Sequence, residues 1–182
     1  MITAITGVYQ PHAKGINTGI HPFKKYFDEL QIGEQLITEK RVITSEDIDR
    51  FADLTGDHFY AHIKTTDFTG TMFEQQVAHG YFIMSIAAGL FVEGYEKNPV
   101  LLNYGIDELR FTKPVYPGAE VHIRFTCKEK LPNDKRVIEK PEDFKRGDDI
   151  DKGIVKWLVE FFDASNEITG VATILTMVAR KP

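Results

Sequence analysis

The segment from Tyr81 to Val92 constrains the fold of this chain more than any other. Ser85 is its only strongly polar side chain, so the segment would be apolar on nearly every side of a helix. It is too short to span a membrane, which takes about 20 apolar residues. A helix that is apolar all round is buried all round. The sequence therefore predicts one helix from Gly80 to Val92, enclosed by the rest of the chain.

Four later segments have the pattern of β-strands. In one of them apolar residues alternate with polar ones, which is the period of a strand with one buried face: Val121, Ile123, Phe125 and Cys127. The other three predicted strands are Val100–Phe111, Ile154–Phe162 and Val171–Ala179. The predicted connections are a turn at Pro114–Gly118, a long charged loop over Leu131–Lys152, and a turn around Ser165 and Asn166.

A short helix is predicted ahead of these elements, over Ser45–Thr55. Thr44 supplies the N-cap oxygen and Asp47 stands at the third position, as in a capping box. Gly56 is a natural stop. The flanking segments are expected to be extended over Tyr26–Ile43, with a turn at Gly33, and loop-like over Asp57–Gln76, with short helical stretches. We expect an N-terminal arm or linker over residues 1–25 and one domain over residues 26–182.

The order of these elements indicates the fold class. Consecutive strands with short connections favour an antiparallel sheet. One long antiparallel sheet wrapped around a single buried apolar helix is the hot-dog fold, an α+β architecture. A sheet edge or face left open in such a fold is usually covered by a second copy, so we expect a homodimer or a larger assembly of dimers.

Composition excludes some functions and favours a cellular location. The net charge of −5 argues against a nucleic-acid partner, which usually needs a basic face. Cys127 is the only cysteine, so no internal disulfide can form and a reducing compartment is expected. The first twenty residues lack the apolar core of a signal peptide, and no membrane span is expected. We therefore expect a cytoplasmic protein.

The segment Thr55–His62 holds the first candidate site. Asp57 and His62, five residues apart after a helix stop, can converge on one water molecule. A carboxylate and an imidazole placed in this way are suited to moving protons to and from water. The alternative is structural, with Asp57 capping a turn and His62 lying on the surface.

The segment Val77–Gly80 holds the second candidate site, because it opens the predicted apolar helix. Backbone N–H groups at a helix start are unpaired and favour negative charge. Gly80 has no side chain to block a ligand, so its N–H could stabilise the oxygen of a developing enolate. The alternative is that Gly80 only permits close packing.

Three motifs in order resemble the MaoC-like, (R)-specific enoyl-CoA hydratase family. They are Gly56-Asp57 with His62, then His79-Gly80 before an apolar helix, then Phe111 with the run Pro114–Gly118. The resemblance implies that Asp57 and His62 are the catalytic pair and that Gly80 supplies an oxyanion-hole N–H. It also implies that Ser85, Tyr60 and His79 support the site. The substrate would be an acyl-CoA thioester, with no cofactor and no metal.

A narrower resemblance is to the C-terminal hydratase domains of the bifunctional phenylacetate-degradation ring-opening proteins, the PaaZ group. The MaoC-like pattern has Asn-Pro where this chain has Phe59-Tyr60, and the runs Asp57–His62, Val77–Tyr81 and Asn103–Gly105 resemble the narrower group. That resemblance implies hydrolytic opening of oxepin-CoA, with Phe59 and Tyr60 either shaping a pocket for a ring or packing elsewhere. The resulting aldehyde would need a separate aldehyde dehydrogenase, because the chain has no Gly-x-Gly-x-x-Gly fingerprint. Ile2–Gly7 resembles the interdomain linker of those proteins, so the chain is either a fragment or a split version.

Other functions remain open at this point. A metal-dependent hydrolase could use His58 and His62, four residues apart, with Asp57 and His79. Against it, Gly56 ends the helix before these residues, and no motif supplies an obvious third ligand. A non-catalytic acyl-CoA-binding module and a thioesterase are the further alternatives. No local motif marks the coenzyme-binding residues, for which Lys113 and Arg110 are the candidates.

Overall fold

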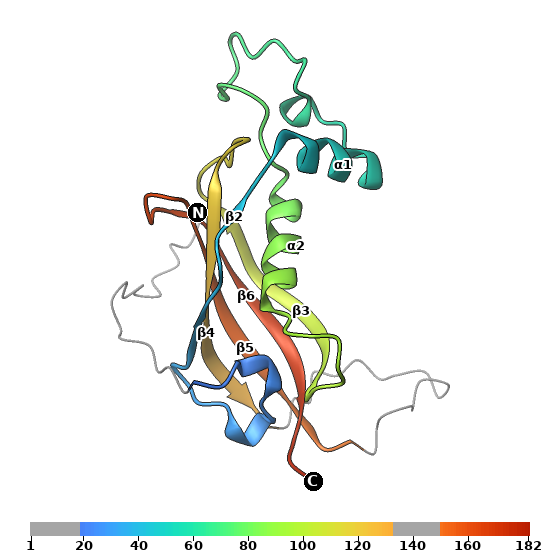
Figure 1. Ribbon diagram of the computed structural model, residues 1–182, viewed down its shortest axis with the longest axis vertical. Helices are drawn as coiled ribbons and strands as arrows, with labels where there is room; N and C mark the ends of the chain where they lie inside the picture. Colours follow the sequence, from blue (N-terminus) through green and yellow to red (C-terminus); the bar gives the residue numbers. More distant parts are fainter. Residues whose placement is uncertain (1–18, 133–149) are drawn as a thin grey trace, which may run out of the picture.

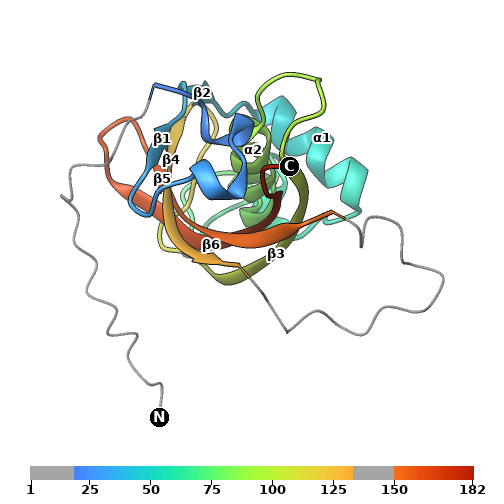
Figure 2. The ribbon, with the colours of Figure 1, turned by 90° about the horizontal axis from the view of Figure 1, so that it is seen from below.

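The computed structural model describes residues 19–132 and 150–182. In this part of the chain a six-stranded antiparallel sheet curves around one long helix, as Figures 1 and 2 show. The helices are α1 (Ser45–Thr55) and α2 (Gly80–Phe91), with three short 3₁₀ turns, η1 (Pro22–Lys24), η2 (Phe27–Glu29) and η3 (Tyr60–His62). The strands are β1 (Gln35–Ile37), β2 (Arg41–Val42), β3 (Val100–Phe111), β4 (Glu120–Leu131), β5 (Lys152–Phe162) and β6 (Ile168–Ala179).

The strand order is β1-β4-β5-β6-β3, and β2 also pairs with β4. Each of the long strands pairs with its neighbour in the antiparallel sense, so the hot-dog architecture expected from the element order is confirmed. The alternating pattern of β4 also holds, because its four apolar residues are completely buried: Val121, Ile123, Phe125 and Cys127. Most of the predicted arm, residues 1–18, and most of the predicted charged loop, residues 133–149, lie outside the described residues.

Local signals around α1 act as predicted. The Thr44 side chain accepts a hydrogen bond from the Asp47 N–H, and the Asp47 carboxylate accepts one from the Thr44 N–H. Gly56 has φ +76°, the left-handed conformation that glycine adopts at helix ends without strain. The helix therefore stops at a fixed point, and the next residue, Asp57, starts the loop above α2 (Figure 1).

Tyr26–Ile43 is less extended than expected. A 3₁₀ turn, η2, precedes the predicted turn at Gly33, and only β1 and β2 are strands. The reason is local: the Glu29 carboxylate accepts from the Tyr26 N–H and closes a turn that a simple extended pattern does not reveal.

Helix α2 packs into the concave side of the sheet. Its buried residues are Phe82, Ile83, Met84, Ala87 and Phe91. The Phe91 ring stacks on Phe125 at 4.5 Å and lies 5.0 Å from Trp157, which joins the end of the helix to β4 and β5.

The prediction that α2 is buried on every side is wrong for the single chain. Tyr81, Ser85 and Gly89, four residues apart along the helix, are exposed, and so is Val92 just after its end. The sheet curves around one side of α2 only (Figure 2). No helix among the described residues is both long and apolar enough to cross a membrane.

Candidate functional site

The loop between α1 and α2 brings the first candidate pair together. After Gly56 the Asp57 N–H donates to Thr55 Oγ1 at 3.3 Å, and Asp57 Oδ1 accepts from the Phe59 N–H at 3.3 Å. The 3₁₀ turn η3 then carries His62 back toward the start of α2. These two turns explain why the side chains of Asp57 and His62, five residues apart, lie close together.

His62 has a defined orientation. Its Nδ1 lies 2.7 Å from the backbone carbonyl oxygen of Val77. A carbonyl only accepts, so Nδ1 carries the hydrogen and Nε2 keeps its lone pair. In this tautomer the imidazole can accept a proton at Nε2.

Gln76 anchors the backbone of the same turn, although its sequence position gave no signal. It is buried, and its Nε2 donates to the His62 carbonyl oxygen at 2.9 Å and to Asp49 Oδ1 at 2.9 Å. Its Oε1 accepts from Ser45 Oγ at 2.6 Å. The amide therefore ties the η3 turn to α1.

His79 lies beneath the pair and is 2% exposed. Its Nε2 is 2.9 Å from the Asp57 carbonyl oxygen, and its ring stacks on that of His62 with centroids 3.7 Å apart and planes inclined by 25°. Burial lowers the pKa of His79, and the neighbouring His62 lowers it further, while the bond to the Asp57 carbonyl opposes both effects. The ring is thus held in its neutral form at neutral pH.

Donor atoms of Asp57, His62 and His79 all lie within 4.8 Å of one another. A water molecule can bridge two groups at this separation, because each hydrogen bond spans about 2.8 Å. The predicted Asp57–His62 pair is therefore assembled, and His79 joins it.

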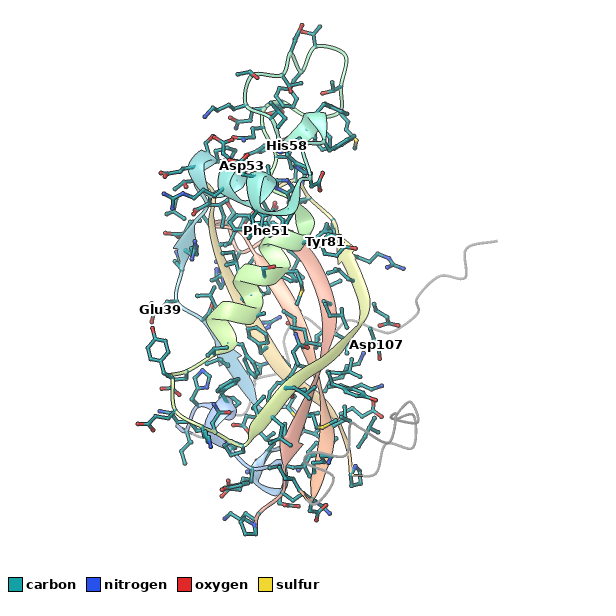
Figure 3. All side chains as sticks on the ribbon, turned by 90° about the vertical axis from the view of Figure 1, so that its right-hand side faces the viewer. Glu39, Phe51, Asp53, His58, Tyr81 and Asp107 are labelled. Atoms are coloured by element: carbon teal, nitrogen blue, oxygen red, sulfur yellow. The ribbon has the colours of Figure 1, made fainter. Side chains whose placement is uncertain are left out.

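The two imidazole rings of this cluster are poorly oriented for a shared metal ion. The lone pair of an imidazole nitrogen lies in the ring plane, and a zinc ion would sit about 2.0–2.1 Å from each nitrogen. Two nearly parallel rings 3.7 Å apart cannot direct both lone pairs to one point at that distance. His58 lies apart from the cluster, with Nε2 3.9 Å from Asp53 Oδ1 on the exposed end of α1, and Figure 3 labels both residues there. The donor set does not fit a shared metal ion.

Gly80 is the first residue of α2, as predicted, and its N–H has no acceptor within the helix. A Cβ atom at this position would lie 2.2 Å from Cε2 of Phe111, so any larger residue would require the Phe111 ring to move. Gly80 therefore combines a backbone N–H without an acceptor in the helix and a close contact with Phe111. The two roles predicted for this glycine, oxyanion binding and close packing, are compatible.

An apolar cavity of about 250 Å³ opens beside Gly80. Its lining includes Ile83 from the core, Phe111 at the end of β3, Phe73 from the loop before α2, and Lys113. Asp57 and His62 do not line it, but Val77, whose carbonyl oxygen contacts the His62 ring, does.

The remaining predicted residues are more scattered. The exposed Ser85 hydroxyl donates to the carbonyl oxygen of Tyr81 within α2, so the described contacts give no support for a link between Ser85 and the Asp57–His62 loop. Lys113 pairs with Glu167, and the Arg110 guanidinium donates to the Leu109 carbonyl.

Tyr60 and Phe59 both lie at the mouth of the site. Their rings are 4.5 Å apart, and that of Phe59 is 5.9 Å from His62. Both side chains are exposed in the single chain, so they are free to contact a ligand or another protein surface.

Comparison with known proteins places these motifs in a family. A family model described as MaoC like domain matches residues 28–145. Protein MaoC of Klebsiella aerogenes is 49% identical over 120 residues, 66% of this chain but only 36% of that protein. A 3-hydroxybutyryl-CoA dehydratase of Methylorubrum extorquens is 30% identical over 115 residues, 62% of this chain and 69% of the enzyme.

A solved structure shares the architecture. The X-ray structure of an Archaeoglobus protein described as a monoamine oxidase regulatory protein superposes with a TM-score of 0.73 at 26% identity. The match covers 92% of this chain and 99% of that one. The hot-dog unit is therefore shared over nearly its full length.

Proposed function

This chain belongs to the MaoC-like domain family of dehydratases and hydratases, and we propose that it adds water to the double bond of an α,β-unsaturated coenzyme A thioester. The observation that carries the proposal is the convergence of Asp57 and His62 above the start of α2. The same geometry serves the reverse reaction, the dehydration of a 3-hydroxyacyl thioester, because both directions pass through one transition state.

The proposed reaction uses three groups. A water molecule lies between the Asp57 carboxylate and Nε2 of His62, which together remove one proton from it. The hydroxyl oxygen bonds to the β-carbon, the double-bond electrons move to the α-carbon and the thioester oxygen, and the Gly80 N–H stabilises the charge that develops there. A proton returned to the α-carbon completes the addition.

The substrate is proposed to be a ring compound, oxepin-CoA of phenylacetate degradation. Support comes from the exposed ring of Phe59, 5.9 Å from His62, and from the exposed Tyr60 ring next to it, which offer flat apolar surface to a ring. Water would add to the enol-ether carbon, the carbon–oxygen bond of the ring would break, and an aldehyde would form. A separate aldehyde dehydrogenase would then consume the product.

A second copy of the chain is proposed to cover the open side of α2. That side carries Tyr81 and Val92, and the neighbouring edge strand β3 exposes Leu101, Leu102 and Ile106. An unpaired strand edge beside apolar surface is a ready surface for association. Sedimentation velocity on the full chain tests this: a dimer or a multiple of it is expected, and a stable monomer at micromolar concentration would contradict it.

The activity is tested with trans-2-butenoyl-CoA and then with oxepin-CoA. With trans-2-butenoyl-CoA the expected result is loss of the enoyl absorbance and formation of the (3R)-hydroxyacyl product. With oxepin-CoA the expected product is the ring-opened aldehyde, and neither substrate should release free thiol. Thiol release without hydration would indicate a thioesterase. Tight binding of both thioesters with no turnover would indicate a non-catalytic binding module.

A further inference from the structure

His79 contacts both members of the proposed pair from the buried side. We infer that His79 is a positioning residue, which fixes the main chain of Asp57 through its Nε2–H and the tilt of the His62 ring through stacking. The inference rests on the proposed function, in that the groups being positioned are those that handle the water molecule.

The hydrogen bond of His79 has only one possible direction. The Asp57 carbonyl can only accept, so His79 Nε2 must donate the hydrogen. In a neutral ring this leaves Nδ1 as a bare acceptor, and Nδ1 is buried without a hydrogen-bond partner among the described residues. Buried acceptors are rarely left unpaired. If packing were the only requirement at position 79, phenylalanine would fill the space without that cost.

The stacked contact acts on His62 in a second way. The bond from His62 Nδ1 to the Val77 carbonyl fixes the rotation of the ring, whereas the flat contact with His79 fixes its tilt. The His79 ring is itself packed against Phe51, with centroids 5.0 Å apart. The direction of the His62 Nε2 lone pair is therefore set by buried groups.

The contacts that position Asp57 and His62 come from one short segment, Val77–Gly80. Val77 holds the His62 ring, His79 holds the Asp57 backbone, and Gly80 offers the N–H proposed to bind the thioester oxygen. One short segment thus fixes the distance between the water-activating pair and the oxyanion site. Errors of about 1 Å in such a distance can cost about 10²-fold in rate.

Two substitutions separate positioning from packing. His79→Phe keeps an aromatic ring against His62 and Phe51 but removes the donor, and it is expected to lower kcat about 10²-fold with KM changed less than about threefold. His79→Gln restores an N–H donor at a similar reach and is expected to recover at least about tenfold of the lost kcat.

A matched control is available on β4, away from the site. His122 is a second histidine whose Nδ1 is buried without a hydrogen-bond partner in the described part of the chain. His122→Phe is expected to leave kcat within about twofold of the parent. Equal kcat in the parent and His79→Phe would overturn the inference, as would a loss in His79→Phe that His79→Gln does not restore.

A measurement without turnover tests the same bond. Long-range ¹H–¹⁵N spectra of the imidazole rings are expected to show hydrogen on Nε2 of His79 and on Nδ1 of His62. Hydrogen on Nδ1 of His79 would overturn the inference whatever the activity. If these tautomers are found but the parent protein hydrates no thioester, the proposed function is wrong. The hydrogen bond from His79 to Asp57 would then have no role in catalysis.

Discussion

A Cβ atom at Gly80 would lie 2.2 Å from Cε2 of Phe111 and 2.5 Å from its Cδ2. The first residue of α2 therefore packs directly against the last residue of β3. A side chain at position 80 would displace the Phe111 ring and would lie beside the backbone N–H at the helix start. The contact with Phe111 and access to the helix terminus therefore depend on the same glycine.

Gly80→Ala is expected to destabilise the fold by about 1–3 kcal/mol, because the Phe111 ring must move to admit the added methyl group. Urea denaturation checks this value. In a Phe111→Ala background the same substitution should cost at least about 1 kcal/mol less, since the clashing ring is gone. Equal costs in the two backgrounds would mean that the ring contact does not govern position 80.

The ion pair between Lys25 and Glu34 is almost fully buried, and Glu34 also accepts from the Gln31 N–H at 3.2 Å. Lys25→Met alone is expected to cost about 3–5 kcal/mol in the free energy of unfolding, because it removes the ammonium group that neutralises a buried carboxylate. The double change Lys25→Met with Glu34→Leu should be less destabilising than Lys25→Met. A double variant that is the less stable of the two would contradict this account of the pair.

The thiol of Cys127 is buried under the sheet, and burial raises its pKa to about 11. The thiolate is the reactive form, so the folded protein should resist a thiol reagent at mildly alkaline pH. Complete modification is expected only after unfolding in denaturant, with the two conditions compared by mass spectrometry. Rapid labelling of the folded chain would show that β4 opens locally.

Burial lowers the pKa of His122, and Lys40 lowers it further. The unfolded chain therefore binds a proton first as the pH falls through about 6.5, so this contribution to stability is present above that pH and is lost below it. His122→Phe removes the ionisable group and keeps a ring against Phe162, on which His122 stacks at 5.2 Å. The variant should lose less stability than the parent between about pH 7.5 and about pH 5.5 in urea denaturation. Burial also lowers the pKa values of His21 and His79, so the free energy of unfolding should still fall with falling pH in both proteins. An identical fall in the parent and in His122→Phe would contradict the prediction.

Elements with local signals were predictable from the sequence. The capping residues Thr44 and Asp47 and the stop at Gly56 defined α1, and the long strands β3 to β6 follow from their apolar patterns. The burial of α2 was not predictable in the same way. Its composition shows that nearly all of its surface is apolar, but not whether the same chain or another covers each side.

The site was predictable in its residue types and only partly in its contacts. The spacing of Asp57 and His62 after a helix stop allowed a convergent pair or a structural role, and the family resemblance favoured the pair; the structure brings the two side chains together. The groups that hold the pair are a backbone carbonyl at Val77 and a buried amide at Gln76, and neither carries a sequence signal of its own. The role predicted for Ser85 has no support in its contacts, because its hydroxyl bonds within its own helix.

The central claim, that Asp57 acts on water added to an unsaturated CoA thioester, is tested most directly by one comparison. The rate of trans-2-butenoyl-CoA hydration is measured for the parent, for Asp57→Asn and for Asp53→Asn, a matched change at an exposed carboxylate on α1. Asp57→Asn is expected to lower kcat by about 10²–10⁴-fold, while Asp53→Asn leaves it within about twofold. Hydration by Asp57→Asn at the parental rate would contradict the account.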